Sequence, residues 1–187
     1  MTQSLRSPLP RNRSTNRLWQ HVALLLASLP MLAISGCETP ISTQYQATAT
    51  TTYTWLVEYE GANRPGERPP RIEEFASTSL ENRNGQKPDG AVTGPDEKGL
   101  WWPALPPKPT IDDIEARQQR QERPGTPRLN KTVEYTITFR RPGEDNRTLP
   151  TRYEVYRQVV KAYEDRIPLE FTLDPAERTV LKATPQG

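Results

Sequence analysis

The chain has 187 residues, 25 of them basic and 23 acidic, with a formal net charge of +2; this length favours a single domain. Residues 1–36 hold four arginines and no acidic residue, so the rest of the chain carries 21 basic and 23 acidic residues, a net charge of −2. A near-neutral body has no long-range attraction for phosphate backbones, which excludes nucleic acid as the primary partner.

Residues 1–36 follow the three-part pattern of an export signal. A basic stretch ends near Arg17, and an apolar stretch of 15 residues runs from Val22 to Gly36, with Pro30 inside it. A membrane-spanning helix needs about 20 apolar residues, whereas a signal core needs about 7–15. We therefore predict a cleaved signal peptide. The alternatives are an uncleaved anchor helix and an apolar core segment followed by a chance cysteine.

The apolar stretch ends in an aliphatic residue, two small residues and a cysteine: Ile34, Ser35, Gly36 and Cys37. This order resembles the lipobox of bacterial lipoproteins. The resemblance implies that diacylglycerol is attached to the Cys37 sulfur, that the chain is cleaved after Gly36, and that the new amino terminus is acylated. The thiolate is the nucleophile that accepts the lipid, and two or more acyl chains hold a protein stably on a membrane.

The resemblance to a lipobox also predicts where the protein is located and what it binds. Glu38, rather than an aspartate, follows the cysteine, which in enteric-type sorting leaves the outer membrane as the default destination. We expect a lipid-anchored protein of the cell membrane or outer membrane that faces the periplasm or the exterior. Its partners would be the membrane, reached through the lipid, and another envelope protein.

The mature chain lacks the side chains on which many enzymes depend. The only cysteine is Cys37 and the only histidine is His21, which is lost with the leader. This excludes disulfides, zinc sites built on cysteine or histidine, and Cys–His or Ser–His–Asp catalysis. Phosphate-binding loops, EF-hands and HExxH motifs are also absent from the sequence. We therefore predict no cofactor, no metal site and no catalytic residues, although a hydrolase based on two carboxylates stays open.

Residues 37–44 are expected to form a lipidated tether, and residues 45–187 a single β-rich domain. Residues 45–59 alternate aromatic or aliphatic side chains with threonines and other polar ones. This period of two, with β-branched and aromatic residues, predicts a half-buried strand.

Residues 61–128 form a proline-rich insertion that holds 11 of the 17 prolines after position 37. Proline removes hydrogen-bond donors and breaks helices, so we expect little regular structure there apart from a short strand at 71–80.

The insertion contains two adjacent tryptophans and a PxxP spacing, at Trp101, Trp102, Pro103 and Pro106. One interpretation is a docking peptide in the polyproline II conformation that binds an aromatic groove on a partner. The other, which we favour, is that the tryptophans fold back and complete a small core.

A helix is predicted from Ile111 to about Glu122. Thr110 is the expected N-cap, and Asp113 occupies the capping-box position. The run from Gly99 to Arg117 is similar to a segment of small uncharacterised cyanobacterial lipoproteins, a resemblance that implies no known activity.

Alternation predicts further strands at 132–140, around Leu169 to Leu173, and at 179–182, with a turn at 142–146. Residues 152–165 are ambiguous, because Val155 and Val159 suit a strand whereas Tyr156, Val160 and Tyr163 have helical spacing. We predict a strand, since hairpin partners lie on both sides.

The expected fold is mainly β (α+β), a small antiparallel sheet or sandwich with one short helix and the long proline-rich excursion. Three functions compete: a non-catalytic accessory or binding lipoprotein, which we favour; a carrier or sensor of a small or lipidic ligand; and a carboxylate-dependent hydrolase. A carrier should have a deep apolar pocket, a hydrolase two facing carboxylates about 5–9.5 Å apart, and a binding module an exposed apolar patch or a free sheet edge.

Overall fold

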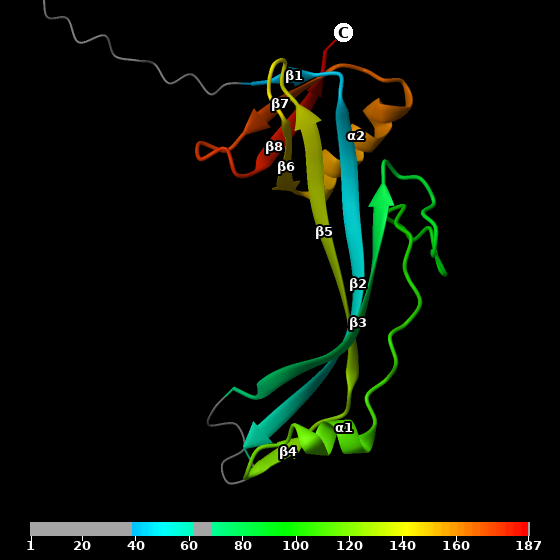
Figure 1. The fold of residues 1–187 in the computed structure, drawn as a ribbon, viewed down its shortest axis with the longest axis vertical. Helices are drawn as coiled ribbons and strands as arrows, with labels where there is room; N and C mark the ends of the chain where they lie inside the picture. The colour runs from blue at the N-terminus through cyan, green and yellow to red at the C-terminus, as the bar shows by residue number, and fades with distance from the viewer. Residues whose placement is uncertain (1–38, 62–68, 187) are drawn as a thin grey trace, which may run out of the picture. The chain divides into compact units, whose positions relative to one another are not determined.

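The computed structural model describes residues 39–61 and 69–186. Figure 1 shows the elements in chain order. They are β1 (Ile41–Ser42), β2 (Tyr45–Gly61), β3 (Arg71–Arg83), α1 (Ile111–Ala116), β4 (Glu122–Pro124), β5 (Arg128–Arg140), β6 (Asn146–Thr151), α2 (Tyr153–Glu164), β7 (Leu169–Leu173) and β8 (Val180–Pro185).

The strands form one sheet in the order β1-β7-β8-β6-β5-β2-β3, and β4 pairs with the far end of β2. The prediction of a mainly β fold is confirmed. Two details were wrong. The sheet is mixed rather than antiparallel, because Thr151 of β6 and Val180 of β8 pair in parallel. All described strands also belong to one sheet, so the sandwich alternative does not apply.

β2 is the central strand, and its pattern explains why. It has 17 residues and pairs with β3 on one side and β5 on the other along most of its length. Side chains at odd positions from Tyr45 to Tyr59 point to one face of the sheet, and those at even positions to the other. The odd face carries most of the buried residues, whereas Gln46, Thr48, Thr50 and Thr52 on the even face are only half-buried.

Residues 152–165 were predicted as a strand, which is wrong: they form α2. Its buried residues, Val155, Tyr156, Val159, Val160 and Ala162, follow the helical period and lie in one core cluster with Tyr45, Ala47 and Ala49 of β2. β5 already has β6 and β2 as neighbours. The apolar residues of this segment are therefore needed to cover the sheet rather than to extend it. The fold consequently has two helices rather than one in its described part.

α1 begins where the sequence predicts. The Thr110 side chain accepts a hydrogen bond from the Asp113 N–H, and the Asp113 side chain accepts one from the Thr110 N–H, which completes the capping box. The helix nevertheless ends at Ala116, about one and a half turns before the predicted end at Glu122. Ile114 is its only buried residue, so no apolar contact supports a longer helix.

The sheet begins within the segment that we predicted as a tether, residues 37–44. Ile41 and Ser42 form β1 and pair with Glu170 and Leu169 of β7. The Pro40 carbonyl accepts a 2.9 Å hydrogen bond from the Phe171 N–H. Ile41 and Ser42, which we expected in the tether at 37–44, are therefore part of the sheet, and Pro40 is hydrogen-bonded to it.

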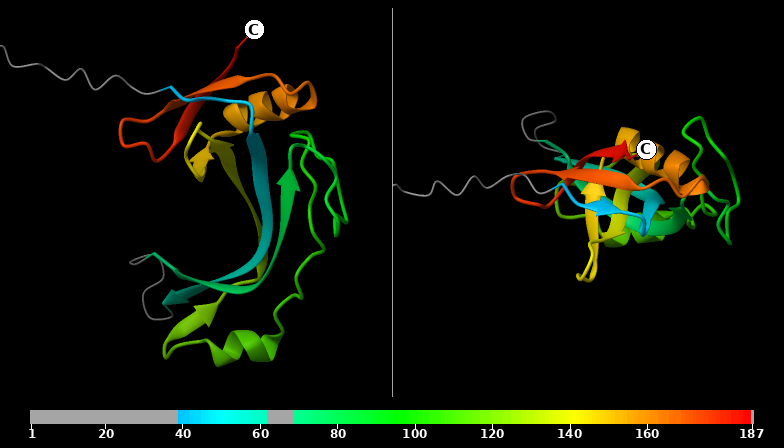
Figure 2. Two further views of the ribbon diagram at one scale, coloured as in Figure 1. Left: turned by 45° about the horizontal axis from the view of Figure 1, so that its top comes forward. Right: turned by 90° about the horizontal axis from the view of Figure 1, so that it is seen from above.

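The proline-rich insertion contributes more structure than expected. β3 extends three residues beyond the predicted strand. Two of its residues, Phe75 and Ala76, lie opposite the single residue Trp55 of β2, which makes a β-bulge. The irregular residues that follow cross the odd face of β2 between α2 and α1 (Figure 2). The odd face is thus covered in succession by α2, by this segment and by α1.

Candidate interaction surfaces

The first candidate site predicted from the sequence, which we call the Trp-Pro segment (residues 99–109), lies on the odd face of β2. Trp102 is only 7% exposed, and its ring centroid is 4.9 Å from that of Tyr53. Its indole Nε1 donates to Asp96 Oδ2 at 2.9 Å. A large apolar ring with a satisfied N–H is typical of a tryptophan that completes a core.

The backbone of Trp101 is held by a side chain that sequence reasoning missed. Asn82 of β3 is fully buried. Its Oδ1 accepts from the Trp101 N–H at 2.6 Å, and its Nδ2 donates to the carbonyls of Trp101 and Ala49. Thr51 Oγ1 donates to the same Trp101 carbonyl at 2.8 Å. Asparagine is uncommon in strands, and Asn82 lies two residues beyond the strand predicted at 71–80, so no sequence signal pointed to this role.

The two prolines of the predicted docking motif face the protein itself. Pro103 and Pro106 are buried, and the Pro106 carbonyl accepts a 3.0 Å hydrogen bond from Trp55 Nε1. A PxxP ligand must present its prolines to the groove of a partner. These contacts therefore agree with the packing interpretation, and Leu105, 60% exposed, is the main apolar side chain that the segment leaves in solvent.

Lysines lie over the aromatic rings of this region. The Lys131 Nζ is 5.4 Å from the Tyr53 ring centroid and 5.3 Å from that of Trp102. Lys87 lies 5.1 Å above Trp101, and Lys108 lies 5.8 Å from the ring of Trp55. Each of these aromatic rings is therefore within reach of a cation–π contact from a lysine of the same chain.

The Asp96 carboxylate accepts hydrogen bonds from the start of the Trp-Pro segment. Burial alone would raise the pKa of its carboxyl group, but hydrogen bonds from the Leu100 N–H, the Trp102 indole and the Lys98 N–H outweigh that effect and lower the pKa. The group is therefore a carboxylate at neutral pH and holds the loop that precedes Trp102.

We expect the stability of the protein to fall as the pH is lowered below about 4, in part because Asp96 is protonated. A lowered pKa in the folded state contributes stability above the unfolded pKa, and this contribution is lost as the pH falls through the folded pKa. Asp96→Asn should therefore be less stable at pH 7 and lose less stability between pH 7 and pH 3. Denaturant unfolding at both pH values measures this, with the exposed Asp89→Asn as control; an unchanged pH dependence would contradict it.

A second charged cluster lies at the α1 end of the sheet. Arg71 donates to Glu122 at 2.7 Å and to Glu73, and its guanidinium lies 4.5 Å from the Tyr59 ring centroid. The hydrogen bond from Arg71 lowers the pKa of Glu122. A general acid needs the opposite shift. Among the described residues, five carboxyl groups have a shifted pKa, and in each of them the pKa is lowered: Asp96, Asp113, Glu122, Asp174 and Glu177.

The even face of the sheet carries a set of half-buried and exposed side chains. Its side chains, which we call the polar sheet face, come from four strands: Gln46, Thr48, Thr50 and Thr52 of β2, Ser77, Ser79 and Glu81 of β3, Thr132, Glu134, Thr136 and Thr138 of β5, and Thr148 and Pro150 of β6. Cross-strand hydroxyl pairs join Thr52 to Ser79 and Thr138 to Thr148, at 2.8 and 2.9 Å. This face presents hydroxyl groups and almost no apolar area.

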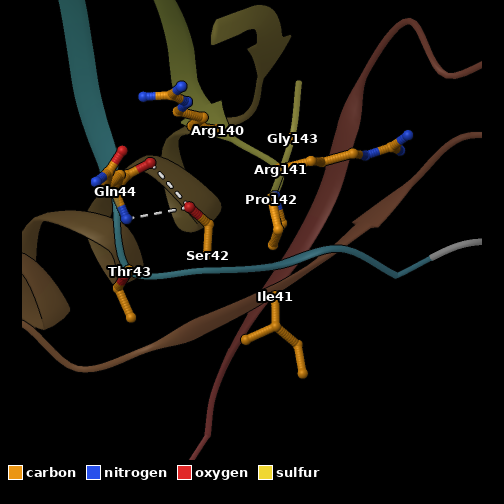
Figure 3. A pocket seen from close by; sticks show the side chains of 8 residues that line it. All are labelled: Ile41, Ser42, Thr43, Gln44, Arg140, Arg141, Pro142 and Gly143. Atoms are coloured by element: carbon orange, nitrogen blue, oxygen red, sulfur yellow. Dashed lines mark hydrogen bonds between the residues drawn. The ribbon is translucent and has the colours of Figure 1, made fainter. Parts of the chain in front are cut away.

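A hollow of about 420 Å³ lies between β1 and the β5–β6 turn (Figure 3), which we call the anchor-end hollow. It is lined by Ile41, Ser42, Thr43, Gln44, Arg140, Arg141, Pro142 and Gly143. Ser42 Oγ accepts from the Gln44 N–H and donates to the Gln44 carbonyl, which fixes the turn into β2. Sequence reasoning missed this site, because strand pairing alone brings residues 41–44 to residues 140–143.

The remaining predicted site residues, Ile34, Ser35, Gly36 and Cys37, lie outside the described residues. Within the described ranges, no group of three or more His, Cys, Asp or Glu side chains is placed to hold a metal ion. No helix among those residues is both long enough and apolar enough to cross a membrane.

Comparison with protein-family models, curated proteins and solved structures finds no match for this chain.

Proposed function

We propose that the chain is a membrane-anchored lipoprotein of the cell envelope that acts as a non-catalytic accessory or binding module. The observation that carries this proposal is the lipobox, Ile34 to Cys37, at the end of a basic and apolar leader. The mature protein would begin at Cys37, be held by lipid in the cell membrane or outer membrane, and face the periplasm or the exterior.

Two structural features support this proposal. The sheet begins at Pro40 and Ile41, directly after the proposed lipid-bearing cysteine, as expected of a body that follows a cleaved leader. The polar sheet face is uncovered, whereas the opposite face is covered by α2, the Trp-Pro segment and α1. The hydroxyl groups of the polar sheet face suit a hydrated contact with another envelope protein, which differs from the exposed apolar patch that we expected of a binding module.

The two alternative functions have weaker support. Trp102, which could have lined a ligand cavity, is buried and packs against Tyr53 of β2. A hydrolase would need one carboxyl group with a raised pKa. The pKa is lowered in each of the described carboxyl groups named above.

The lipid anchor is tested by Cys37→Ala. We expect this variant to lose all labelling by a clickable fatty acid and to move from the membrane fraction to the soluble fraction, because no other nucleophile replaces the thiolate. Ser35→Ala is the matched control, since it keeps a small residue before the cleavage site and should be labelled like the parent. Unchanged labelling and fractionation of Cys37→Ala would refute the proposal.

A further inference from the structure

The described structure leaves very little chain between the sheet and Cys37. Pro40 is fixed by the Phe171 N–H, and Ile41 is paired with Glu170. Three residues of extended chain span at most about 11 Å. If Cys37 carries lipid, as the proposed function requires, the surface beside Pro40 must therefore lie within about 11 Å of the point where the lipid leaves the protein.

The anchor-end hollow lies on this surface. Ile41 is 52% exposed and forms one of its walls. Gly143 forms part of the opposite wall, in the β5–β6 turn, and a Cβ there would meet no heavy atom within 4 Å. The hollow is therefore open at the turn, and it combines an exposed aliphatic side chain with small polar residues and two arginines.

The two arginines differ in their partners. Figure 3 shows that Arg140, the last residue of β5, and Arg141, which follows it, project in opposite directions. Arg141 is near two carboxylates, with nitrogens 3.8 Å from Glu144 and 3.6 Å from Glu177. Arg140 is exposed, and its Nε donates to the neutral carbonyl of Glu144 at 3.1 Å. A guanidinium bound to a neutral carbonyl keeps its full charge for an external anion.

We propose that the anchor-end hollow binds the phosphate of a membrane phospholipid, with Arg140 as the charged contact. A guanidinium matches the geometry of a phosphate group and is weakly hydrated. Ile41, whose side chain is exposed, lines the same hollow from β1, as expected where a surface meets the boundary between headgroups and acyl chains. The lipoprotein would then stand on the membrane by this end, in one orientation, rather than move freely on a tether.

This orientation places the other end of β2 away from the bilayer. β2 has 17 residues, which at about 3.3 Å per residue extend roughly 55 Å. Its distal end contacts α1, since the Tyr59 hydroxyl donates to the Ile114 carbonyl at 2.8 Å. Residues of α1 are therefore suitable distal reference positions.

The test uses the full, lipidated protein in vesicles of phosphatidylcholine and phosphatidylglycerol that carry a headgroup quencher. Because the chain has a single cysteine and lipid would occupy it, a new cysteine is a unique site for a fluorophore. Asp145→Cys, in the β5–β6 turn, reports on the hollow, and Asp112→Cys, on α1, is its matched distal control. We expect several-fold stronger quenching at position 145 than at position 112.

Arg140 is tested in the Asp145→Cys background. Arg140→Gln should reduce the quenching at position 145 at least twofold, and Arg140→Lys should restore part of it because the positive charge returns. Arg123→Gln, an exposed arginine on β4 at the distal end, should have no effect. Equal quenching at positions 145 and 112, or quenching that does not depend on Arg140, would overturn the inference.

The fatty-acid labelling of the same preparation separates this inference from the proposed function. Labelled protein without quenching at position 145 contradicts the phosphate site and leaves the lipid anchor intact. Protein without label contradicts the lipid anchor itself.

Discussion

Replacing Trp102 with alanine is expected to lower the free energy of unfolding by about 3–5 kcal/mol, the usual cost of truncating a buried aromatic side chain. The ring is 7% exposed and packs 4.9 Å from Tyr53. Its loss also leaves the Asp96 carboxylate without the indole donor. A small domain has a total stability of about 5–15 kcal/mol, so the variant should unfold at a much lower denaturant concentration.

Denaturant unfolding of a soluble form that starts at residue 38 measures this effect. Leu105→Ala is the matched control, because Leu105 belongs to the same segment and is 60% exposed; its change should stay within about 0.5 kcal/mol. A Trp102→Ala protein that unfolds like the parent would revive the interpretation of the segment as a docking peptide.

Asn82→Ala should lower the free energy of unfolding by about 2–3 kcal/mol, since it leaves the Trp101 N–H without an acceptor and removes one donor from the Trp101 carbonyl. The Trp101 N–H loses its 2.6 Å acceptor, and the Trp101 carbonyl loses one of its two donors. Asn130→Ala, on the exposed surface of β5, is the control and should have a change near zero.

Asn82 and Trp102 should also be coupled. Both hold the Trp-Pro segment on the odd face, so removal of either side chain loosens the contacts of the other. The double variant should therefore lose less stability than the two single variants together, by at least 0.5 kcal/mol, the lower end for residues that share partners. Strict additivity would show that the two side chains hold the segment independently.

Strands with one buried face were predictable because their pattern is local. β2, β5 and β7 alternate apolar and polar residues, and each was placed within a few residues of its observed bounds. The start of α1 was predictable for the same reason, since Thr110 and Asp113 satisfy each other's backbone groups within one turn.

Residues 152–165 were mispredicted because their pattern fits two periods. Tyr153, Val155 and Val159 suit a strand, and Tyr156, Val160 and Tyr163 suit a helix. The choice depends on what the rest of the fold requires, which is an apolar cover for Ala47 and Ala49 of β2. Only a helix buries Val155, Tyr156, Val159 and Val160 on that face at once.

The sequence alone predicted the leader and the lipobox, which stay a proposal. It also predicted the half-buried strands and the capping of α1, and it shows that no cysteine or histidine follows Cys37. Each of these depends on residues that are close together along the chain. The tertiary structure decided the β1–β7 pairing, the parallel contact of β6 with β8, the burial of Pro103 and Pro106, and the placement of Ile41 and Arg140 around the anchor-end hollow. These contacts join residues about 30 to 130 positions apart, whose pairing depends on the free energy of the whole sheet and leaves no local periodic signal.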